Sequence, residues 1–347
     1  MRKIKLGIIG LGRAGKGMHL RELEGKESMF EIAAVCDIEK DRCEEVAEKY
    51  GCKTYTTIDA FLKDKDVEVV DIATRSCDHF LHTKMALDAG KFVLLEKPMA
   101  CTAEEAKELF KIGEGRLFIR HNRRFEAKFL QVNEIIASGI LGDVYLIKLA
   151  RNSYQRRCDW QTLSQYGGGQ LLNWGPHIID HSLYFCGGGY TKLDSCLKRV
   201  AAAGDCEDFI KVLFFGQNGR VVDMEISGGT ALKTPEYVLY GTRGTLYDNG
   251  ETCTLRYIDP AVQLEEIKAS EETPAGAKFA APPAVPFITE ERVWDKNNLD
   301  HIWAALYETV VNGKPYPIKS EEALAVMTTI DEIKKVHREN VIEKGIM

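Results

Sequence analysis

The stretch IKLGIIGLGRAG, residues 4–15, gives the strongest indication of the fold. Residues 4–9 form an isoleucine-rich run typical of a buried strand, and a helix-compatible segment begins at Arg13. A second apolar run, EIAAVCD at residues 31–37, completes a strand–helix–strand unit of the usual length. The chain therefore opens with one unit of a parallel sheet.

Three glycines in this unit are spaced for a dinucleotide. Gly10, Gly12 and Gly15 form GxGxxG directly after a strand and at the start of a helix, which is the context this motif requires. One glycine permits a tight turn, one leaves room for a pyrophosphate and one allows close helix–strand packing. Without that context the pattern would indicate only a glycine-rich turn.

An acidic residue follows at the position that reads the cofactor's ribose. Asp37 ends the second strand 22 residues beyond Gly15, where a carboxylate accepts hydrogen bonds from an adenosine ribose and repels a 2'-phosphate. This favours NAD, although Arg42 nearby leaves NADP open. The alternative is that Asp37 only ends the strand or caps the next helix.

Strands and helices continue to alternate up to about residue 123. The next helix carries its apolar residues at i, i+3, i+4 and i+7 and ends at Gly51. The further elements expected are strands at residues 67–73 and 92–95, a helix at 78–89 between them, and a helix opened by the capping box Thr102-x-x-Glu105. Apolar strands alternating with helices predict an α/β domain with a doubly wound parallel sheet over residues 1–123.

Residues 124–347 have a different pattern. The expected strands are residues 144–149, 209–215, 221–226, 237–240 and 252–258. The short connection at residues 217–219 indicates a hairpin and hence a mostly antiparallel sheet of an α+β domain. Asp223 and Glu225 alternate with apolar residues, so one sheet face is expected to point outward, where a second subunit can cover it. The last helix, around residues 323–330, is expected to pack back on the body.

Composition narrows the function classes. The 347 residues suit two domains, and 46 Lys and Arg against 52 Asp and Glu, without long blocks of one sign, favour neither nucleic acid nor an anionic membrane as partner. No 18 consecutive apolar residues occur, and the short apolar run near the start is interpreted as a strand rather than a signal peptide. Ten cysteines without CxxC spacing indicate reduced thiols and a cytoplasmic location.

Two segments carry the residues suited to chemistry. Lys97 follows an apolar strand of the first sheet between Glu96 and Pro98, at the edge where such folds bind ligands; the alternative is a solvated surface charge. The segment GGGQLLNWGPHIIDH, residues 167–181, places His177, Asp180 and His181 on one helix face. These three side chains can in principle bind zinc, but no fourth ligand is evident, so no metal site is expected.

Six segments of the chain resemble the glucose–fructose oxidoreductase, inositol dehydrogenase and MocA (Gfo/Idh/MocA) family of NAD(P)-dependent oxidoreductases. They are GIIGLGRAG (7–15), DIATRSCDHF (71–80), LLEKPMA (94–100), HNRRF (121–125), GGGQLLNWGPHIIDH (167–181) and NGKPYPIKSEEALAVM (312–327). The resemblance implies a Rossmann domain followed by an open-faced sheet domain that forms homo-oligomers, dimers or tetramers, through the sheet. It also implies that Lys97 and His177 line the substrate site beside the nicotinamide.

Residue roles follow from these matches. The cofactor-binding residues are expected to be Gly10, Leu11, Gly12, Arg13, Ala14, Gly15, Asp37, Thr74, His79, Glu96 and Lys97. Lys97 and His177 are expected to be catalytic, and Asn173, Asp180, His181, Arg75 and Arg124 are expected to bind substrate. Pro176 suits a first helical turn or marks a kink, and a helix that starts there favours a neutral His177, the form a general base requires.

The chain departs from the family pattern at two positions. Asn173 stands four residues before His177, where many members carry an aspartate, and it cannot supply negative charge. Arg75-Ser76 stands where members often have Pro-Asn. An arginine there is suited to a substrate carboxylate or phosphate, or alternatively to a structural salt bridge.

The leading interpretation is an NAD-dependent dehydrogenase that oxidises a secondary hydroxyl of a sugar, cyclic polyol or related compound. Asn173 and Arg75 also suit a redox-neutral glycosidase or epimerase that regenerates NAD in each cycle. A regulator that senses a nucleotide or sugar on the same fold is the third alternative. Residues 273–287, rich in Ala and Pro, are expected to form a surface loop or an ordered excursion.

Overall fold

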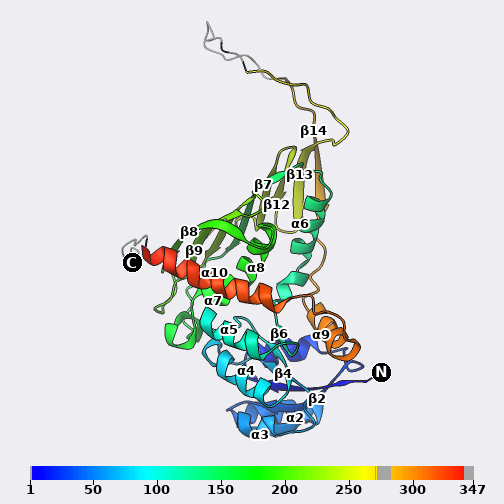
Figure 1. Cartoon of the computed structure of the whole chain (residues 1–347), viewed down its shortest axis with the longest axis vertical. Helices are drawn as coiled ribbons and strands as arrows, with labels where there is room; N and C mark the ends of the chain where they lie inside the picture. The colour runs from blue at the N-terminus through cyan, green and yellow to red at the C-terminus, as the bar shows by residue number, and fades with distance from the viewer. Residues whose placement is uncertain (1, 270, 272–282, 340–347) are drawn as a thin grey trace.

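The computed structural model describes residues 2–269, 271 and 283–339. Two sheets lie at opposite ends of the molecule, and the long helix α10 (Ser320–Glu339) crosses between them. Figure 1 shows the N-terminal sheet and its helices below α10 and the larger C-terminal sheet above it.

The N-terminal sheet has six parallel strands in the order β3-β2-β1-β4-β5-β6. They are β1 (Ile4–Ile9), β2 (Phe30–Cys36), β3 (Lys53–Tyr55), β4 (Val69–Ile72), β5 (Phe92–Leu95) and β6 (Leu117–Ile119). The order reverses beside β1, as in a doubly wound Rossmann sheet, so the predicted fold of this half is confirmed. The three-residue strands β3 and β6 at the two edges were not predicted.

The helices of this half agree with the predicted pattern except at the first and at the short helix Ile58–Leu62, which was not predicted. They are α1 (Leu20–Glu22), α2 (Lys40–Tyr50), α3 (Ile58–Leu62), α4 (His79–Asp88) and α5 (Ala103–Ile112). The segment expected to be helical from Arg13 begins as a π-helical turn, η1 (Gly15–His19), in which the His19 amide bonds to the Ala14 carbonyl. Turns of this type are rare and occur often at functional sites.

The C-terminal sheet has eight strands in the order β14-β13-β12-β11-β7-β10-β9-β8. They are β7 (Val144–Asn152), β8 (Tyr190–Lys198), β9 (Phe209–Gly216), β10 (Val221–Ser227), β11 (Tyr237–Gly241), β12 (Gly244–Asp248), β13 (Thr252–Ile258) and β14 (Phe287–Val293). All neighbours are antiparallel except β7 and β10, which confirms the mostly antiparallel prediction and the β9–β10 hairpin. Strands β8, β12 and β14 were not predicted.

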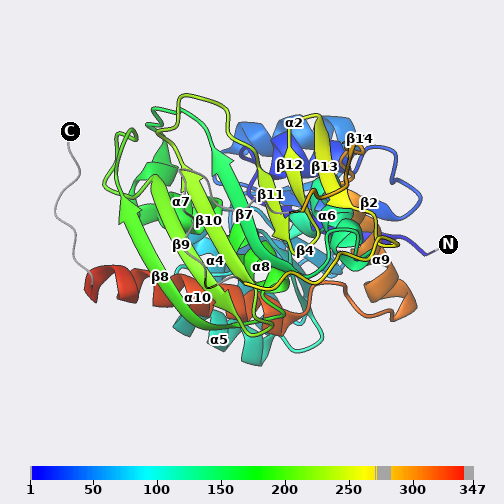
Figure 2. The same ribbon diagram turned by 90° about the horizontal axis from the view of Figure 1, so that it is seen from above.

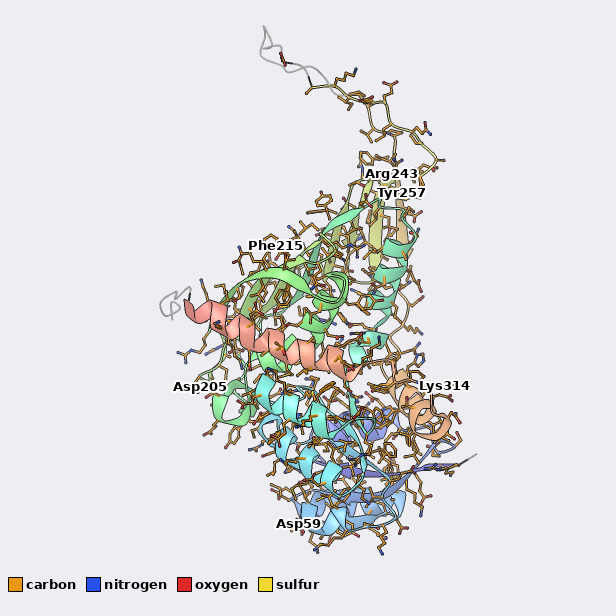
Figure 3. The ribbon with its side chains drawn as sticks, in the orientation of Figure 1. Asp59, Asp205, Phe215, Arg243, Tyr257 and Lys314 are labelled. Atoms are coloured by element: carbon orange, nitrogen blue, oxygen red, sulfur yellow. The ribbon has the colours of Figure 1, made fainter. Side chains whose placement is uncertain are left out.

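The two faces of this sheet differ as the alternation predicted. Val222, Met224 and Ile226 are buried on the inner face, whereas Asp223 and Glu225 face outward and pair with Lys211 of β9. Seen from above, the strands lie side by side over the Rossmann half (Figure 2). Figure 3 places Phe215 of β9 on the side turned away from that half, so the open face is an outer surface of the chain.

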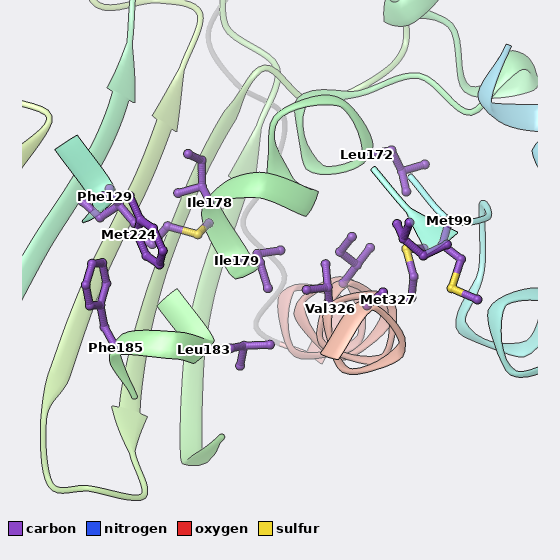
Figure 4. Packing of buried hydrophobic residues seen from close by; sticks show 14 of the residues in the cluster. Met99, Phe129, Leu172, Ile178, Ile179, Leu183, Phe185, Met224, Val326 and Met327 are labelled. Atoms are coloured by element: carbon purple, nitrogen blue, oxygen red, sulfur yellow. The ribbon is translucent and has the colours of Figure 1, made fainter. Parts of the chain in front are cut away.

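Helices cover the inner face and link the halves. They are α6 (Ala127–Ala137), α7 (Gln170–Asn173), α8 (Gly175–Phe185) and α10, with the short helical turns η3 (Asn122–Phe125), η4 (Trp160–Thr162) and η5 (Ser164–Tyr166). Helix α9 (His301–Asn312) and the turn η2 (Ser76–Asp78) belong with the Rossmann half. Val326 and Met327 of α10 lie between Met99 of the Rossmann half and Ile179 of α8 (Figure 4). The two halves therefore share one apolar core.

The chain also returns to the N-terminal half before α10. Trp303 and Tyr307 of α9 pack with Phe30 of β2 in the core of the Rossmann sheet. Residues 273–282 of the Ala- and Pro-rich segment lie outside the described residues, and the described chain on either side extends away from the body (Figure 1).

Candidate active site

The glycine loop after β1 has room for a dinucleotide at one glycine only. Gly10 has a φ of +92°, and a Cβ there would lie 2.7 Å from the Ala73 carbonyl oxygen. A Cβ at Gly15 would lie 1.9 Å from the Gly10 carbonyl oxygen, so both positions require glycine for packing. A Cβ at Gly12 would meet nothing within 4 Å. The open space at Gly12 fits the pyrophosphate that the motif predicts.

Asp37 connects this loop to the end of β2. Its Oδ2 accepts a hydrogen bond of 2.6 Å from the Leu11 amide, and its Oδ1 accepts one of 2.9 Å from the Glu39 amide. Arg42 reaches Oδ1 at 3.4 Å. The carboxylate is 8% exposed and stands at the carboxyl edge of β2, where a ribose is expected.

His79 braces the opposite side of the loop. One ring nitrogen lies 2.7 Å from the Pro98 carbonyl and the other 3.2 Å from the Thr74 carbonyl. Burial lowers the pKa of His79, so the neutral ring donates one of these bonds. The contacts fix the turn after β4 against the Lys97–Pro98 turn after β5, in which the peptide bond is cis.

Lys97 reaches from this turn to the C-terminal half. Its ammonium donates to the backbone carbonyl of Asn173 at 3.0 Å and to the side-chain oxygen of Asn173 at 3.3 Å. Burial lowers the pKa of Lys97, which the charge of Glu96 partly offsets. A lysine so placed can donate to a substrate hydroxyl and stabilise the negative charge that develops on it.

His177 lies one helical turn beyond Asn173. Helix α8 begins at Gly175 with Pro176 in its first turn, which agrees with the first of the two predicted possibilities. The ring is 6% exposed, and its Nδ1 is buried with no hydrogen-bond partner among the described residues. Burial and the positive charges of Lys97 and Arg123 hold the pKa of His177 well below its ordinary value of 6.5. The side chain is therefore neutral and can accept a proton.

Asp180 and Arg124 form an ion pair beneath this site. Both carboxylate oxygens of Asp180 bind Arg124, and Oδ1 also lies 3.4 Å from Nδ1 of His121. Arg124 reaches Glu322 of α10 at 3.2 Å. Asp180 is 2% exposed, and its carboxylate is bonded to side chains of the protein. Direct contact of Asp180 or Arg124 with substrate stays a prediction.

His181 is likewise bonded within the protein. Its Nε2 lies 3.1 Å from the Arg123 carbonyl, its Nδ1 lies 3.3 Å from the Tyr237 hydroxyl, and its ring stacks on Phe129 with centroids 3.9 Å apart. Burial lowers the pKa of His181 to about 4. The predicted substrate contact of His181 stays a prediction.

Arg75, unlike Arg124, is not paired with a carboxylate among the described residues. Its side chain is exposed and stacks on Tyr166 and Trp160, with the guanidinium carbon 4.6 Å and 6.0 Å from the ring centroids. No carboxylate in the described part of the chain lies within ion-pair distance of it, so the salt-bridge alternative finds no support. Next to Trp160, the side-chain amide of Gln161 donates to Asn173 at 3.4 Å.

Sequence reasoning missed a buried ionic network beneath Lys97. His19 lies with Nδ1 2.7 Å from Asp71 and Nε2 3.0 Å from Glu96. Arg120 binds Glu96 at 2.7 Å and also Glu22, which accepts a hydrogen bond from the Trp303 indole. A signal was available: Asp71 interrupts a strand that is otherwise apolar, and a fully buried carboxylate requires a partner.

Residues of the HNRRF segment also surround the site. The ring of His121 lies 6.2 Å from that of His177, and Arg123 stacks on Trp174 at 4.4 Å. Among the described residues no group of three or more His, Cys, Asp or Glu side chains is arranged to bind a metal. In the same residues no helix has the length and apolar character needed to span a bilayer.

Two family models match most of the chain. Residues 4–116 match the oxidoreductase family with an NAD-binding Rossmann fold (Gfo/Idh/MocA), and residues 129–247 match the Gfo/Idh/MocA C-terminal domain. The first match covers the glycine loop and Lys97, and the second covers Asn173 and His177.

Curated relatives include oxidoreductases of this kind. An uncharacterised oxidoreductase of Schizosaccharomyces pombe is 30% identical over 268 residues, 72% of this chain and 71% of the relative. The scyllo-inositol 2-dehydrogenase (NADP(+)) of Bacillus subtilis is 30% identical over 53% of this chain and 52% of its own length. The D-glucoside 3-dehydrogenase of Escherichia coli is 32% identical over 53% and 54%.

A solved structure shows the same fold over the whole chain. An oxidoreductase from Bacillus subtilis superposes with a TM-score of 0.81 at 20% identity, covering 99% of this chain and 100% of that one. At this identity the likeness concerns the fold alone. The fold of the whole chain therefore has a counterpart among solved structures.

Proposed function

Because this chain belongs to the Gfo/Idh/MocA family of NAD(P)-binding oxidoreductases, we propose that it is an NAD-dependent dehydrogenase of a secondary hydroxyl of a sugar, cyclic polyol or related compound. One observation carries the proposal. The Lys97 ammonium is bonded to Asn173, one helical turn before a neutral, buried His177, at the sheet edge that holds the glycine loop. A lysine that can stabilise an alkoxide and a neutral histidine that can accept a proton are together suited to proton removal from an alcohol.

The roles of the two side chains follow from their charges. Lys97 donates to the hydroxyl oxygen and stabilises the alkoxide, while His177 takes the proton. A bound nicotinamide would supply the hydride acceptor for the carbon that carries this hydroxyl, so oxidation of a secondary alcohol by NAD would give a ketone, NADH and one proton. Asn173 holds Lys97 through two uncharged oxygens and leaves its positive charge available.

The test is NADH formation measured by absorbance. Purified protein is mixed with NAD and a panel of hexoses, amino sugars, phosphorylated sugars, sugar acids and inositols. The parent is compared with Lys97→Met and with Lys111→Met, an exposed lysine on α5. We expect one compound to give multiple turnovers that only Lys97→Met abolishes. NAD binding without turnover of any compound would contradict a dehydrogenase and favour the regulatory alternative.

The choice of NAD rests on Asp37. Its carboxylate is fixed by two backbone amides at the edge of β2 and repels a 2'-phosphate. Arg42 is the nearby cation that can lessen this repulsion, and one relative is named as NADP-dependent. The preference for NAD over NADP is tested by comparing KM for the two cofactors in the parent and in Asp37→Ser. Equal KM values in the parent would contradict an NAD preference.

A second candidate is redox-neutral chemistry in which NAD is regenerated in each cycle. The observation in its favour is Asn173, which leaves Lys97 facing an amide where many family members carry a carboxylate. Product formed from a glycoside or epimerisable sugar at substoichiometric NAD, without net NADH, would establish it. Release of one NADH for each product would exclude it.

The open face of the C-terminal sheet supports the proposal of a homo-oligomer. Tyr145 and Tyr247 on this face are 53% and 47% exposed, and Phe215 lies on the same side. Such a surface is suited to a second copy of the sheet. We expect light scattering to show a dimer or tetramer that Phe215→Asp weakens and Leu81→Asp, on exposed α4, does not. A monomeric parent would contradict it.

A further inference from the structure

The surroundings of Lys97 and His177 carry excess positive charge. Lys97 is bonded to uncharged oxygens of Asn173, and the charged groups that act most strongly on His177 after burial are Lys97 and Arg123. The carboxylates close by are engaged elsewhere. Asp180 binds Arg124, and Glu96 binds His19 and Arg120. Arg123 is paired with Glu126, whereas the hydrogen bonds of the Lys97 ammonium go to uncharged oxygens of Asn173, so an anion placed in this site would meet the Lys97 charge directly.

Arg75 adds a second cation, whose guanidinium is held in a fixed position by two aromatic rings. The aromatic rings of Tyr166 and Trp160 hold its guanidinium by stacking, which leaves the N–H groups at its edge free to donate. Within residues 2–269, 271 and 283–339, no hydrogen-bond acceptor or carboxylate binds these N–H groups. A guanidinium in this state binds a carboxylate or phosphate through two parallel hydrogen bonds.

Arg75 and Lys97 lie at the same edge of the N-terminal sheet. Arg75 follows β4 and Lys97 follows β5, and these strands are parallel neighbours, so both side chains leave the same edge of the sheet. On the other side, Trp160 stacks on Arg75 while the adjacent Gln161 donates to Asn173, which holds Lys97. One wall of the C-terminal half therefore contacts both cations.

From this arrangement we propose that the substrate is an anionic sugar or polyol, whose carboxylate or phosphate binds Arg75 while Lys97 and His177 engage the hydroxyl to be oxidised. The proposal rests on the proposed dehydrogenase and specifies its substrate class. Asn173 has a part in it, because an aspartate at this position would place a negative charge against Lys97 and disfavour an anionic substrate.

The experiment compares matched substrates. NADH formation is measured with neutral hexoses, the corresponding uronic and aldonic acids, and the hexose 6-phosphates, for the parent, Arg75→Met and Arg21→Met. Arg21 is an exposed arginine on α1 and serves as the control. We expect kcat/KM for the anionic substrate to fall about 10- to 100-fold in Arg75→Met, mostly through KM, because charge-assisted hydrogen bonds are lost. Arg21→Met keeps the parent's values, and the acid and phosphate series separate the two sources of charge.

The Asn173→Asp variant is the second test. We expect it to lower kcat/KM for the anionic substrate relative to its neutral counterpart. A parent that prefers the neutral hexose, or an Arg75→Met variant that slows neutral and anionic substrates equally, overturns the inference. In that case Lys97-dependent NADH formation from a neutral sugar leaves the proposed function standing. No turnover of any compound means that both fail.

Discussion

His19 and His177 are both buried near Lys97, and their environments are opposite. His19 has a carboxylate on each ring nitrogen, Asp71 at 2.7 Å and Glu96 at 3.0 Å. Burial and Arg120 oppose its charge, but the two carboxylates outweigh them and raise the pKa of His19 to about 9. His177 has a ring nitrogen without a partner in the described chain and cations around it, and its pKa lies well below 6.5.

The two histidines show that nearby charges and hydrogen-bond partners, rather than burial alone, set the charge of a buried histidine ring. Between two carboxylates the ring is a fixed cation that holds the ends of β4 and β5 together through Asp71 and Glu96. Beside Lys97 the ring is kept neutral, which is the form that can take a proton. The contrast predicts a structural role for His19 and a chemical role for His177.

The largest effect is expected for His177→Ala. Removing a general base lowers kcat about 10²- to 10⁴-fold, because the hydroxyl proton loses its acceptor. The measurement is NADH formation with the substrate found in the panel. His301→Ala, an exposed histidine on α9, is the matched control and should retain parental kcat. If His177→Ala keeps the parental kcat, the base is another group and the contrast is lost.

For His19→Ala the large effect is on stability. The substitution leaves Asp71 and Glu96 buried without their shared cation, and breaking such a pair costs about 3–5 kcal/mol of unfolding free energy. Urea unfolding of the two variants measures this directly. We expect His177→Ala to lose much less, because its ring has no ion pair to break. Equal losses in the two variants would show that the His19 network adds nothing beyond packing.

The dependence of stability on pH sharpens the contrast. The folded-state pKa of His19 is raised to about 9 from 6.5, so its contribution is full below pH 6.5 and is lost as pH rises through about 9. By linkage this contribution amounts to about 3 kcal/mol. His177 has the opposite sign, because its depressed pKa makes the folded state less stable as pH falls below 6.5. Urea unfolding between about pH 5.5 and 9.5 should show both slopes, each missing in the corresponding variant.

Much of the fold was predictable because its central strands are continuous apolar runs. β1, β2, β4 and β5 lie in the middle of the first sheet and are largely buried, so each is a short apolar run of the kind expected for a strand of a parallel sheet. The strands that escaped prediction lie mostly at edges. β8 mixes polar and apolar residues because α10 covers only one of its faces, and β14 is exposed along nearly all its length.

The sequence named candidate site residues but could not give their contacts. The surroundings of Lys97 and His177 in the chain singled them out, but Lys97 meets Asn173 across 76 residues of sequence, which no local pattern encodes. The same holds for Asp180, whose pairing with Arg124 joins residues 56 positions apart and was not predicted. Helical spacing shows which residues share one face of a helix, but it does not show which parts of the protein pack against that face.

A third histidine gives the smallest expected effect. His181 is buried like His19 and bonded on both ring nitrogens, but to a hydroxyl and a carbonyl, and burial lowers its pKa to about 4. Its ring is therefore neutral, and both ring nitrogens are bonded within the protein. Tyr237→Phe removes the hydroxyl at 3.3 Å and should lower the unfolding free energy by about 1 kcal/mol, the usual contribution of a neutral hydrogen bond. Urea unfolding at neutral pH measures the loss.

The kcat of the same variant decides between this role and the substrate contact predicted from helical spacing. If His181 acts only through Tyr237 and Phe129, Tyr237→Phe leaves kcat and KM unchanged while stability falls. Tyr50→Phe is the control, since its hydroxyl bonds a carbonyl of the Rossmann half at 3.5 Å, remote from His181. A rise in KM without loss of stability would instead indicate that His181 contacts the substrate. The Tyr237 hydroxyl would then serve to orient the His181 ring toward the substrate rather than to stabilise the fold.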